Sequence, residues 1–334
     1  MTDPLSPLEA AEREPARRTA MPRWHAPMLA TLSHADIDDD GWCFERKLDG
    51  ERVIARIRPG GEVQLYSRNH RRLDASYPDI EAALARQAPR GCLLDGEVVA
   101  FDARHRSDFQ RLQPRMQAAD REEARRSGVR VYYYLFDCLY ACGHDLTGCT
   151  LRSRKKLLRT LIDWRAPLRW TPHRIQDGPG YHRQACDRGW EGLIAKRADS
   201  AYVAGRSREW RKWKCRHQQE FVIGGHTEPH GEREGLGALL LGVYQEDELV
   251  YAGKVGTGFD AAMLATLKDR LSPLARETSP FQRGDPPREG VRFVSPRLVC
   301  EVAFTEWTRD GRLRHPSFQG LRRDKAPRDV HRED

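Results

Sequence analysis

The sequence has no long apolar run. None of its 334 residues lies in a stretch approaching the roughly 20 apolar residues that a bilayer-spanning helix needs. Residues 1–20 mix acidic, basic and proline residues and contain no apolar segment of the kind found in signal peptides. We therefore expect no membrane partner and a cytoplasmic location.

Paired cysteines and histidine-based metal motifs are also missing. The eight cysteines include no Cys-x-x-Cys pair, and the twelve histidines form no His-Glu-x-x-His sequence. This spacing argues against a zinc site and against a disulfide framework, and it predicts free or buried thiols. The segment Gly253–Gly258 is glycine-rich but lacks the spacing of a phosphate-binding loop, so it predicts a turn beside a strand.

Positive charge is in modest excess. The 57 Lys and Arg residues outnumber the 49 Asp and Glu residues, for a formal net charge of +8. This balance is compatible with a polyanionic partner such as nucleic acid, although a protein that is merely basic would look the same. The length favours two domains over one.

The first two thirds of the chain predict a mixture of strands and helices. Over 42–67, apolar residues at 53, 55 and 57 alternate with arginines at 52, 56 and 58, which is typical of half-buried strands. A turn is expected at 59–61. Further strands are expected at 92–101 and 131–140, and helices at 77–87, 108–126 and 151–164. The last of these helices has a basic face (Arg152, Arg154, Lys155 and Lys156), for which solvent exposure and contact with a DNA backbone are both open.

The composition changes after Cys215. A glycine-rich, strand-forming region predicts a hairpin over 238–255, followed by a helix at 261–271 and a strand at 299–307. Several short strands with one helix in about 110 residues favour a small barrel of the OB type. We expect a flexible tail over 1–22, one domain over 23–217 and a second over 218–328.

Seven short motifs, most of them polar, follow one another along the chain. The first is Lys47-Leu48-Asp49-Gly50-Glu51-Arg52, which alone could be an ordinary Asp-Gly hairpin. The others are Ser67–Asn69, Asp95–Glu97, Phe136-Asp137, Glu191–Lys196 and Trp210–Lys214, with Arg322–Lys325 in the C-terminal tail.

This ordered set resembles the covalent nucleotidyltransferases, which comprise ATP-dependent DNA ligases, RNA ligases and mRNA capping enzymes. The resemblance covers roughly residues 26–326. The segments 224–259, 301–307 and 314–318 also resemble the ligase module of bacterial end-joining DNA ligases. The resemblance implies an α+β fold, in which an adenylation domain of antiparallel sheets with flanking helices precedes a C-terminal OB-fold β-barrel. We expect neither the polymerase nor the phosphoesterase module that these relatives often carry within these 334 residues.

The resemblance makes Lys47 the nucleophile that takes AMP from ATP. Its amine must be unprotonated to attack, whereas a free lysine has a pKa near 10.4, so nearby cations are expected to lower it. Arg52, Lys196, Lys214 and a bound metal ion would supply those cations.

The remaining roles are also implied by the resemblance. Glu97 would contact the ribose, while Glu97 and Glu191 would hold Mg²⁺ or Mn²⁺. Glu45 would select adenine, and Phe136 would either stack on adenine or belong to the core. The cations expected to grip the nucleotide phosphates, the ribose or the DNA 5′-phosphate are Arg52, Arg68, Lys196, Lys212 and Lys214. Arg322, Asp324 and Lys325 would close over the nucleotide, whereas Asp49 and Asp95 are expected to stabilise turns.

The function implied is an ATP-dependent DNA ligase that seals 5′-phosphate/3′-hydroxyl breaks in nicked or broken duplex DNA, in repair or recombination. It would be a monomer, and whether it needs an end-binding protein such as Ku is open. One alternative is an RNA ligase or capping-type nucleotidyltransferase on the same scaffold. The other is a non-catalytic OB-fold DNA-binding protein, which would never acquire AMP.

Overall fold

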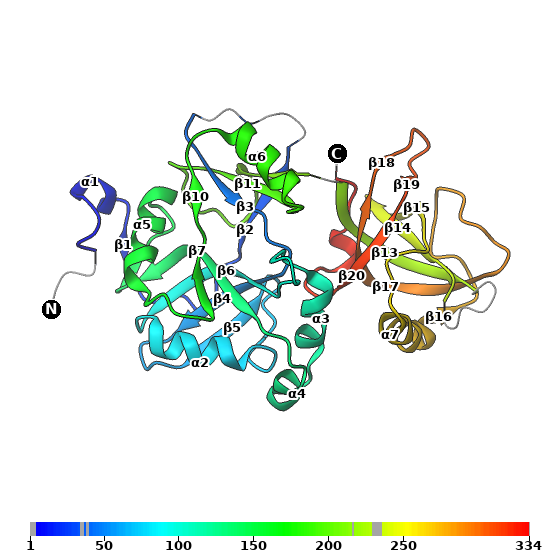
Figure 1. Ribbon diagram of the computed structural model, residues 1–334, viewed down its shortest axis with the longest axis horizontal. Coiled ribbons are helices and arrows are strands. Elements are labelled where there is room, and N and C mark those ends of the chain that lie inside the picture. Colours follow the sequence, from blue (N-terminus) through cyan, green and yellow to red (C-terminus); the bar gives the residue numbers. More distant parts are fainter. Residues whose placement is uncertain (1–4, 34–36, 38–39, 216, 229–235, 334) are drawn as a thin grey trace. The chain divides into compact units, whose positions relative to one another are not determined.

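Two compact units follow each other along the chain, Met1–Cys215 and Arg216–Asp334 (Figure 1). The computed structural model describes residues 5–33, 37, 40–215, 217–228 and 236–333. Within these residues, no helix is both long and apolar enough to span a membrane.

The larger sheet of the first unit has seven strands, in the order β1-β8-β7-β6-β4-β5 with β9 beside β7. Neighbouring strands are antiparallel, except for β7 and β9. The strands are β1 (Arg17–Arg18), β4 (Glu51–Ile57), β5 (Val63–Ser67), β6 (Cys92–Val99), β7 (Tyr132–Ala141), β8 (His144–Asp145) and β9 (Leu168–Trp170).

The second sheet of this unit has five strands in the order β10-β3-β11-β12-β2. Only β12 and β2 run parallel. The strands are β2 (Met28–Leu32), β3 (Trp42–Arg46), β10 (His173–Arg174), β11 (Gly192–Arg197) and β12 (Gly205–Lys214).

Six helices accompany these sheets within the described part of the unit. They are α1 (Ala10–Arg13), α2 (Pro78–Gln87), α3 (Phe109–Gln117), α4 (Arg121–Arg126), α5 (Leu151–Leu161) and α6 (Gly178–Asp187). The single helical stretch predicted over 108–126 is wrong, because it is divided into α3 and α4. Asp120 starts the second helix by accepting hydrogen bonds from the backbone N–H groups of Glu122 and Glu123.

Side-chain alternation explains how the layers assemble. In β4, Val53 and Ala55 join the core that contains residues of α2, α3 and α5. Ile54, which points to the opposite face, packs in a cluster with Met28 of β2 and Trp210 of β12. The two sheets therefore face each other across this cluster, and the first sheet is buried on both faces.

The outer face of the second sheet is covered by α6. Phe44, Leu193 and Trp213, one from each of three neighbouring strands, pack with Tyr181 and Ala185 of this helix. Residues of β3, β11 and β12 with the opposite parity must then point toward the first sheet. This set contains Glu45, Lys196 and Lys214, so alternation alone gathers the polar motifs into the space between the sheets.

The N-terminal segment is ordered from Leu5, contrary to the predicted flexible tail over 1–22. Leu5 and Leu8 are buried in the helix-side core, and β1 pairs with β8. The scattered apolar residues of this segment gave no periodic signal, but they are enough to anchor it.

The second unit is built on a six-stranded sheet in the order β15-β14-β13-β17-β16, with β20 beside β17. Among the described strands, the two ends of this order do not pair, so hydrogen bonds do not close the sheet into a full barrel. The expected α+β class with antiparallel sheets is confirmed. The elements are β13 (His217–Thr227), β14 (Leu239–Gln245), β15 (Glu248–Val255), α7 (Ala261–Leu271), β16 (Ala275–Arg276), β17 (Val291–Phe304), β18 (Glu306–Trp307), β19 (Leu313–Arg314) and β20 (Ser317–Arg322).

The prediction that all thiols are free is wrong for one pair. Cys186 at the end of α6 and Cys215 after β12 form a disulfide, with their Cα atoms 5.3 Å apart. They are 29 residues apart in the sequence, and only the packing of α6 on the second sheet brings them together. The other six cysteines are free.

Candidate functional site

Lys47 lies immediately after β3, where the backbone leaves the second sheet. Its N–H donates to the carbonyl of Gly192 at 2.9 Å, which fixes its position beside the start of β11. Its Nζ is 2.5 Å from Oε1 of Glu191. Gly192 has a φ of +145°, and a Cβ there would lie 2.2 Å from the carbonyl oxygen of Trp213. The Glu-Gly pair thus allows three chain segments to meet at the lysine.

Glu45, two residues before Lys47, is the centre of a buried charge cluster. Its carboxylate lies 2.6 Å from Nζ of Lys196 on β11 and forms a second ion pair with Lys155 on α5. All three side chains are at most 3% exposed. Lys155 also donates to the carbonyl of Thr171 and lies over the ring of Trp170, 4.5 Å from its centroid.

The charges of this cluster shift the pKa values of Glu45 and Lys196. Burial alone would raise the pKa of Glu45, but the adjacent charges of Lys155 and Lys196 outweigh it and keep that pKa below its usual value. Burial lowers the pKa of Lys196 to about 8, aided by Lys155 and opposed by Glu45. Lys196 is therefore close to losing its proton at moderately alkaline pH.

Arg52 and Asp95 make a second ion pair on the facing sheet. Asp95 is fully buried and accepts hydrogen bonds from Nε and Nη2 of Arg52, at 2.5 and 2.6 Å. The hydroxyl of Tyr202 donates to the same carboxylate at 2.5 Å and accepts from the N–H of Met28 at 2.9 Å. Asp95 lies within β6 rather than in a turn, so the role predicted for it is wrong. Burial works against the charged form of Arg52, but Asp95 raises its pKa overall.

Phe136 and Trp210 bring the two charge clusters together. The Lys196 amine is 3.9 Å from the ring centroid of Phe136 and 4.0 Å from that of Trp210. The Arg52 guanidinium lies over the same rings, at 4.5 and 5.6 Å. Cations of both sheets therefore share one aromatic pair, and Phe136 is 7% exposed in this packing.

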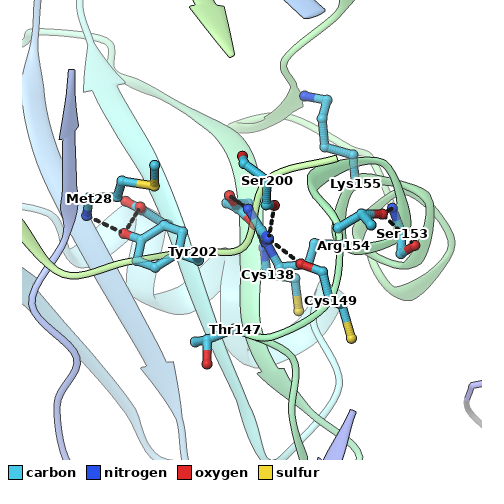
Figure 2. A network of polar contacts seen from close by, with 12 residues as sticks. Met28, Cys138, Thr147, Cys149, Ser153, Arg154, Lys155, Ser200 and Tyr202 are labelled. Carbon is cyan, nitrogen blue, oxygen red and sulfur yellow. Dashed lines mark hydrogen bonds and ion pairs between the residues drawn. The ribbon is translucent and has the colours of Figure 1, made fainter. Parts of the chain in front are cut away.

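Arg154, which precedes Lys155 on α5, forms a further buried ion pair with Asp137. It donates from Nε and Nη2 to the two carboxylate oxygens of Asp137, at 2.7 and 3.0 Å, and both side chains are fully buried. Its Nη1 reaches the carbonyls of Cys149 and Ser200 (Figure 2). The picture shows the adjacent Lys155 side chain pointing elsewhere. For Arg154 and Lys155, the two roles left open for the basic helix face are both wrong, because these side chains are buried ion-pair partners.

The other predicted residues of the first unit lie on the expected strands or directly after them. Glu97 is partly buried on β6, opposite Arg52 in register, and Arg68 follows β5. Lys212 and Lys214 are partly buried on β12, opposite Ile194 and Gly192.

The C-terminal motif is held by ion pairs inside the second unit. Arg322 contacts Glu301 at 2.7 Å and Asp324 at 2.9 Å, while Lys325 contacts Glu220 at 3.0 Å. Asp324 is buried. These contacts define how the motif is anchored to β13 and β17.

Sequence reasoning missed Lys155 and Tyr202 as members of this site, and it gave Trp210 no role of its own although it placed this residue in the motif Trp210–Lys214. Lys155 belongs to a helix whose neighbouring residues are also basic, so charge alone could not distinguish the buried lysine. Trp210 offered a signal, because it has the same strand parity as Lys212 and Lys214.

Two families of known proteins match successive parts of this chain. Residues 27–214 match the ATP dependent DNA ligase domain, and residues 232–325 match the ATP dependent DNA ligase C terminal region. The first match alone covers more than half of the chain.

Individual proteins give the same result. The multifunctional non-homologous end joining protein LigD of Pseudomonas aeruginosa is 43% identical over 95% of this chain, which spans only 38% of that protein's length. DNA ligase C1 of Mycolicibacterium smegmatis is 32% identical, with 90% of each chain covered. A structure of mycobacterial DNA ligase D complexed with ATP and MES is 37% identical, covers 92% of this chain and 98% of that one, and has a TM-score of 0.67.

Proposed function

The chain belongs to the ATP-dependent DNA ligase family, and we propose that it seals breaks in duplex DNA through a lysyl-AMP intermediate on Lys47. The observation that carries the proposal is the position of Lys47. Its backbone is pinned to Gly192 and its amine contacts Glu191, at the end of the strand that carries the buried Glu45 cluster.

Three transfers make up the reaction. Nζ of Lys47 attacks the α-phosphorus of ATP, a P–N bond forms, and pyrophosphate leaves. The 5′-phosphate of a broken strand then attacks the same phosphorus and releases Lys47. Finally, the 3′-hydroxyl attacks the activated 5′-phosphate, and AMP leaves as the phosphodiester forms.

Glu45 is the group we assign to adenine recognition. An ionised carboxylate only accepts hydrogen bonds, so it suits the amino group of adenine and disfavours the carbonyl that guanine has there. Lys155 would position this carboxylate from α5. Phe136 would supply the stacking surface for the base, as the sequence resemblance implies.

Lys196 fits a place beside Glu45 better than direct contact with the α-phosphate. Its amine is 2.6 Å from the Glu45 carboxylate and lies over the rings of Phe136 and Trp210, so that carboxylate already balances its charge. Lys212 and Lys214 are only partly buried and lie at the end of β12, next to Glu191, so we assign phosphate binding to them. Arg68 would bind the DNA 5′-phosphate.

Glu191 and Glu97 would hold the divalent cation together with the ATP phosphates. Mg²⁺ commonly binds through one or two carboxylates plus substrate phosphates, and these two side chains provide that donor class. When bound, the ion would offset negative charge on the phosphates. In this structure Glu191 is the counter-ion of Lys47, so the same carboxylate can contact either the lysine amine or the metal ion.

The second unit would contribute Arg322, Asp324 and Lys325 to the orientation of pyrophosphate, and basic surfaces of both units would hold DNA phosphates. We further propose that the enzyme acts as a monomer in the cytoplasm, associated with the nucleoid, in DNA repair. A DNA end-binding protein such as Ku is a candidate partner, because the LigD relative is a non-homologous end joining protein.

Sealing of a nicked duplex tests the proposal. The chain, ATP and Mg²⁺ should convert a labelled 5′-phosphate nick into a full-length strand, and Glu45→Gln should weaken the preference for ATP over GTP. Joining of RNA but not DNA would favour the RNA-ligase alternative. DNA binding without AMP transfer would favour the binding-protein alternative.

A further inference from the structure

We propose that Cys186 and Cys215 form a reversible thiol–disulfide site, assisted by His182, whose state controls the strand end that carries Lys214. The effect on catalysis rests on the proposed function, whereas the thiol chemistry does not. The disulfide joins the end of α6 to the residue immediately after β12.

His182 lies one helical turn before Cys186 on the same helix. Its Nε2 is 3.7 Å and its Nδ1 3.9 Å from Sγ of Cys186, and all three side chains bring ligating atoms within 4.8 Å of one another. The imidazole stacks on the indole of Trp213, with centroids 4.1 Å apart and planes 3° from parallel. The ring is thus held against the sulfur by residues of both α6 and β12.

Exposure distinguishes this pair from every other cysteine except Cys142, which is also partly exposed. Cys186, Cys215 and His182 are partly exposed, so a small thiol can reach them. Five of the six free cysteines are buried: Cys43, Cys92, Cys138, Cys149 and Cys300. Burial raises the pKa of each of these five thiols, which leaves them unreactive.

The exchange reaction balances with a low-molecular-weight thiol as the reductant. A thiolate R–S⁻ attacks Sγ of Cys215, the S–S bond breaks, and Cys186 leaves as a thiolate that can accept a hydrogen bond from the ring N–H of His182. A second R–SH displaces the mixed disulfide, giving R–S–S–R and a second protein thiol. Two electrons pass to the protein, and the disulfide R–S–S–R reverses the reaction.

The bond acts on the nucleotide site through β12. The N–H of Cys215 donates to the carbonyl of Glu191 at 2.9 Å, and Lys214 lies opposite Gly192 in register. With the disulfide closed, this corner is fixed covalently to α6. With it open, hydrogen bonds and side-chain packing alone hold the end of β12, and Lys214 and Glu191 lose positional restraint.

Thiol counting tests the chemistry. In buffer containing oxidised glutathione, alkylation in denaturant followed by intact-mass measurement should find six modified cysteines, and after reduction it should find eight. Cys186→Ser should abolish this difference, whereas the matched variant Cys142→Ser, at a partly exposed cysteine outside the pair, should preserve it. His182→Leu, which removes the ring N–H donor, should leave the disulfide able to form but slow its reduction several-fold. Eight alkylated thiols under oxidising conditions would overturn the site, as would one zinc ion per chain bound to the unoxidised cysteines.

Adenylylation of Lys47 tests the control. The reduced protein should react with labelled ATP roughly tenfold more slowly than the disulfide form, less than the ~10²-fold that a misplacement of an ångström can cost. Cys186→Ser should give one slow rate in both buffers. Equal rates for the two states of the wild type would overturn the control. Absence of adenylylation in both states would refute the proposed function and leave the thiol result standing.

Discussion

Replacing Lys155 by methionine should destabilise the first unit, because it removes one of the two cations that hold the buried Glu45. Lys155 and Glu45 are 2% and 3% exposed, so water cannot take the place of the missing partner. Breaking a buried ion pair by removing one partner costs about 3–5 kcal/mol. Lys196 still contacts Glu45, which places the expected loss near the lower end, at about 3 kcal/mol.

Urea unfolding followed by tryptophan fluorescence measures this loss. The neighbouring variant Lys156→Met is the matched control, since that side chain is 45% exposed and pairs with Glu12 at the surface, where a pair contributes about 0–1 kcal/mol. The double variant Glu45→Gln/Lys155→Met should be less destabilised than the sum of the single variants, because the Lys155–Glu45 ion pair that both changes remove can be lost only once. If Lys155→Met unfolds within about 1 kcal/mol of the wild type, the buried cluster does not work as described.

Three further outcomes follow from the same structure. The pKa of Lys196, about 8, lies below the ordinary lysine value of 10.5. Between these two values the unfolded chain binds more protons than the folded protein, so the stability measured by urea unfolding should rise by about 1–2 kcal/mol from pH 8 to 9.5, and Lys196→Met should lack this rise. Gly96→Ala should cost about 1–3 kcal/mol in urea unfolding, because its Cβ would lie 2.5 Å from the carbonyl oxygen of Tyr134, whereas Gly60→Ala, with nothing within 4 Å, should be near neutral. Cys215→Ser should lower the unfolding free energy by about 3–4 kcal/mol, as expected for a bond across 29 residues, and reductant should then have no further effect.

The strands that carry chemistry could be predicted from the sequence because their signal is local. Alternation over 42–67 and the turn at 59–61 match β3, β4 and β5 closely, and the helix predicted at 261–271 is α7. The motif residues also lie where this alternation requires, on the face of each sheet that meets the other.

Partners contributed by distant segments could not be predicted in this way. Lys155 becomes part of the site only because α5 packs where its amine reaches Glu45, 110 residues earlier in the chain. Tyr202 reaches Asp95 across 107 residues. The disulfide likewise depends on the packing of α6. In each case, the residue type was visible but its burial was not.

Covalent capture of AMP tests the central claim most directly. The protein is incubated with α-labelled ATP and Mg²⁺, denatured and separated by electrophoresis, alongside Lys47→Ala and Lys268→Ala, whose lysine is exposed on α7 of the second unit. Intact-mass measurement first shows whether the purified protein already carries AMP. We predict a labelled band for the wild type and Lys268→Ala, discharged by pyrophosphate, and none for Lys47→Ala. A band of equal intensity in Lys47→Ala, or a wild type that carries no AMP before or after incubation, would contradict the account.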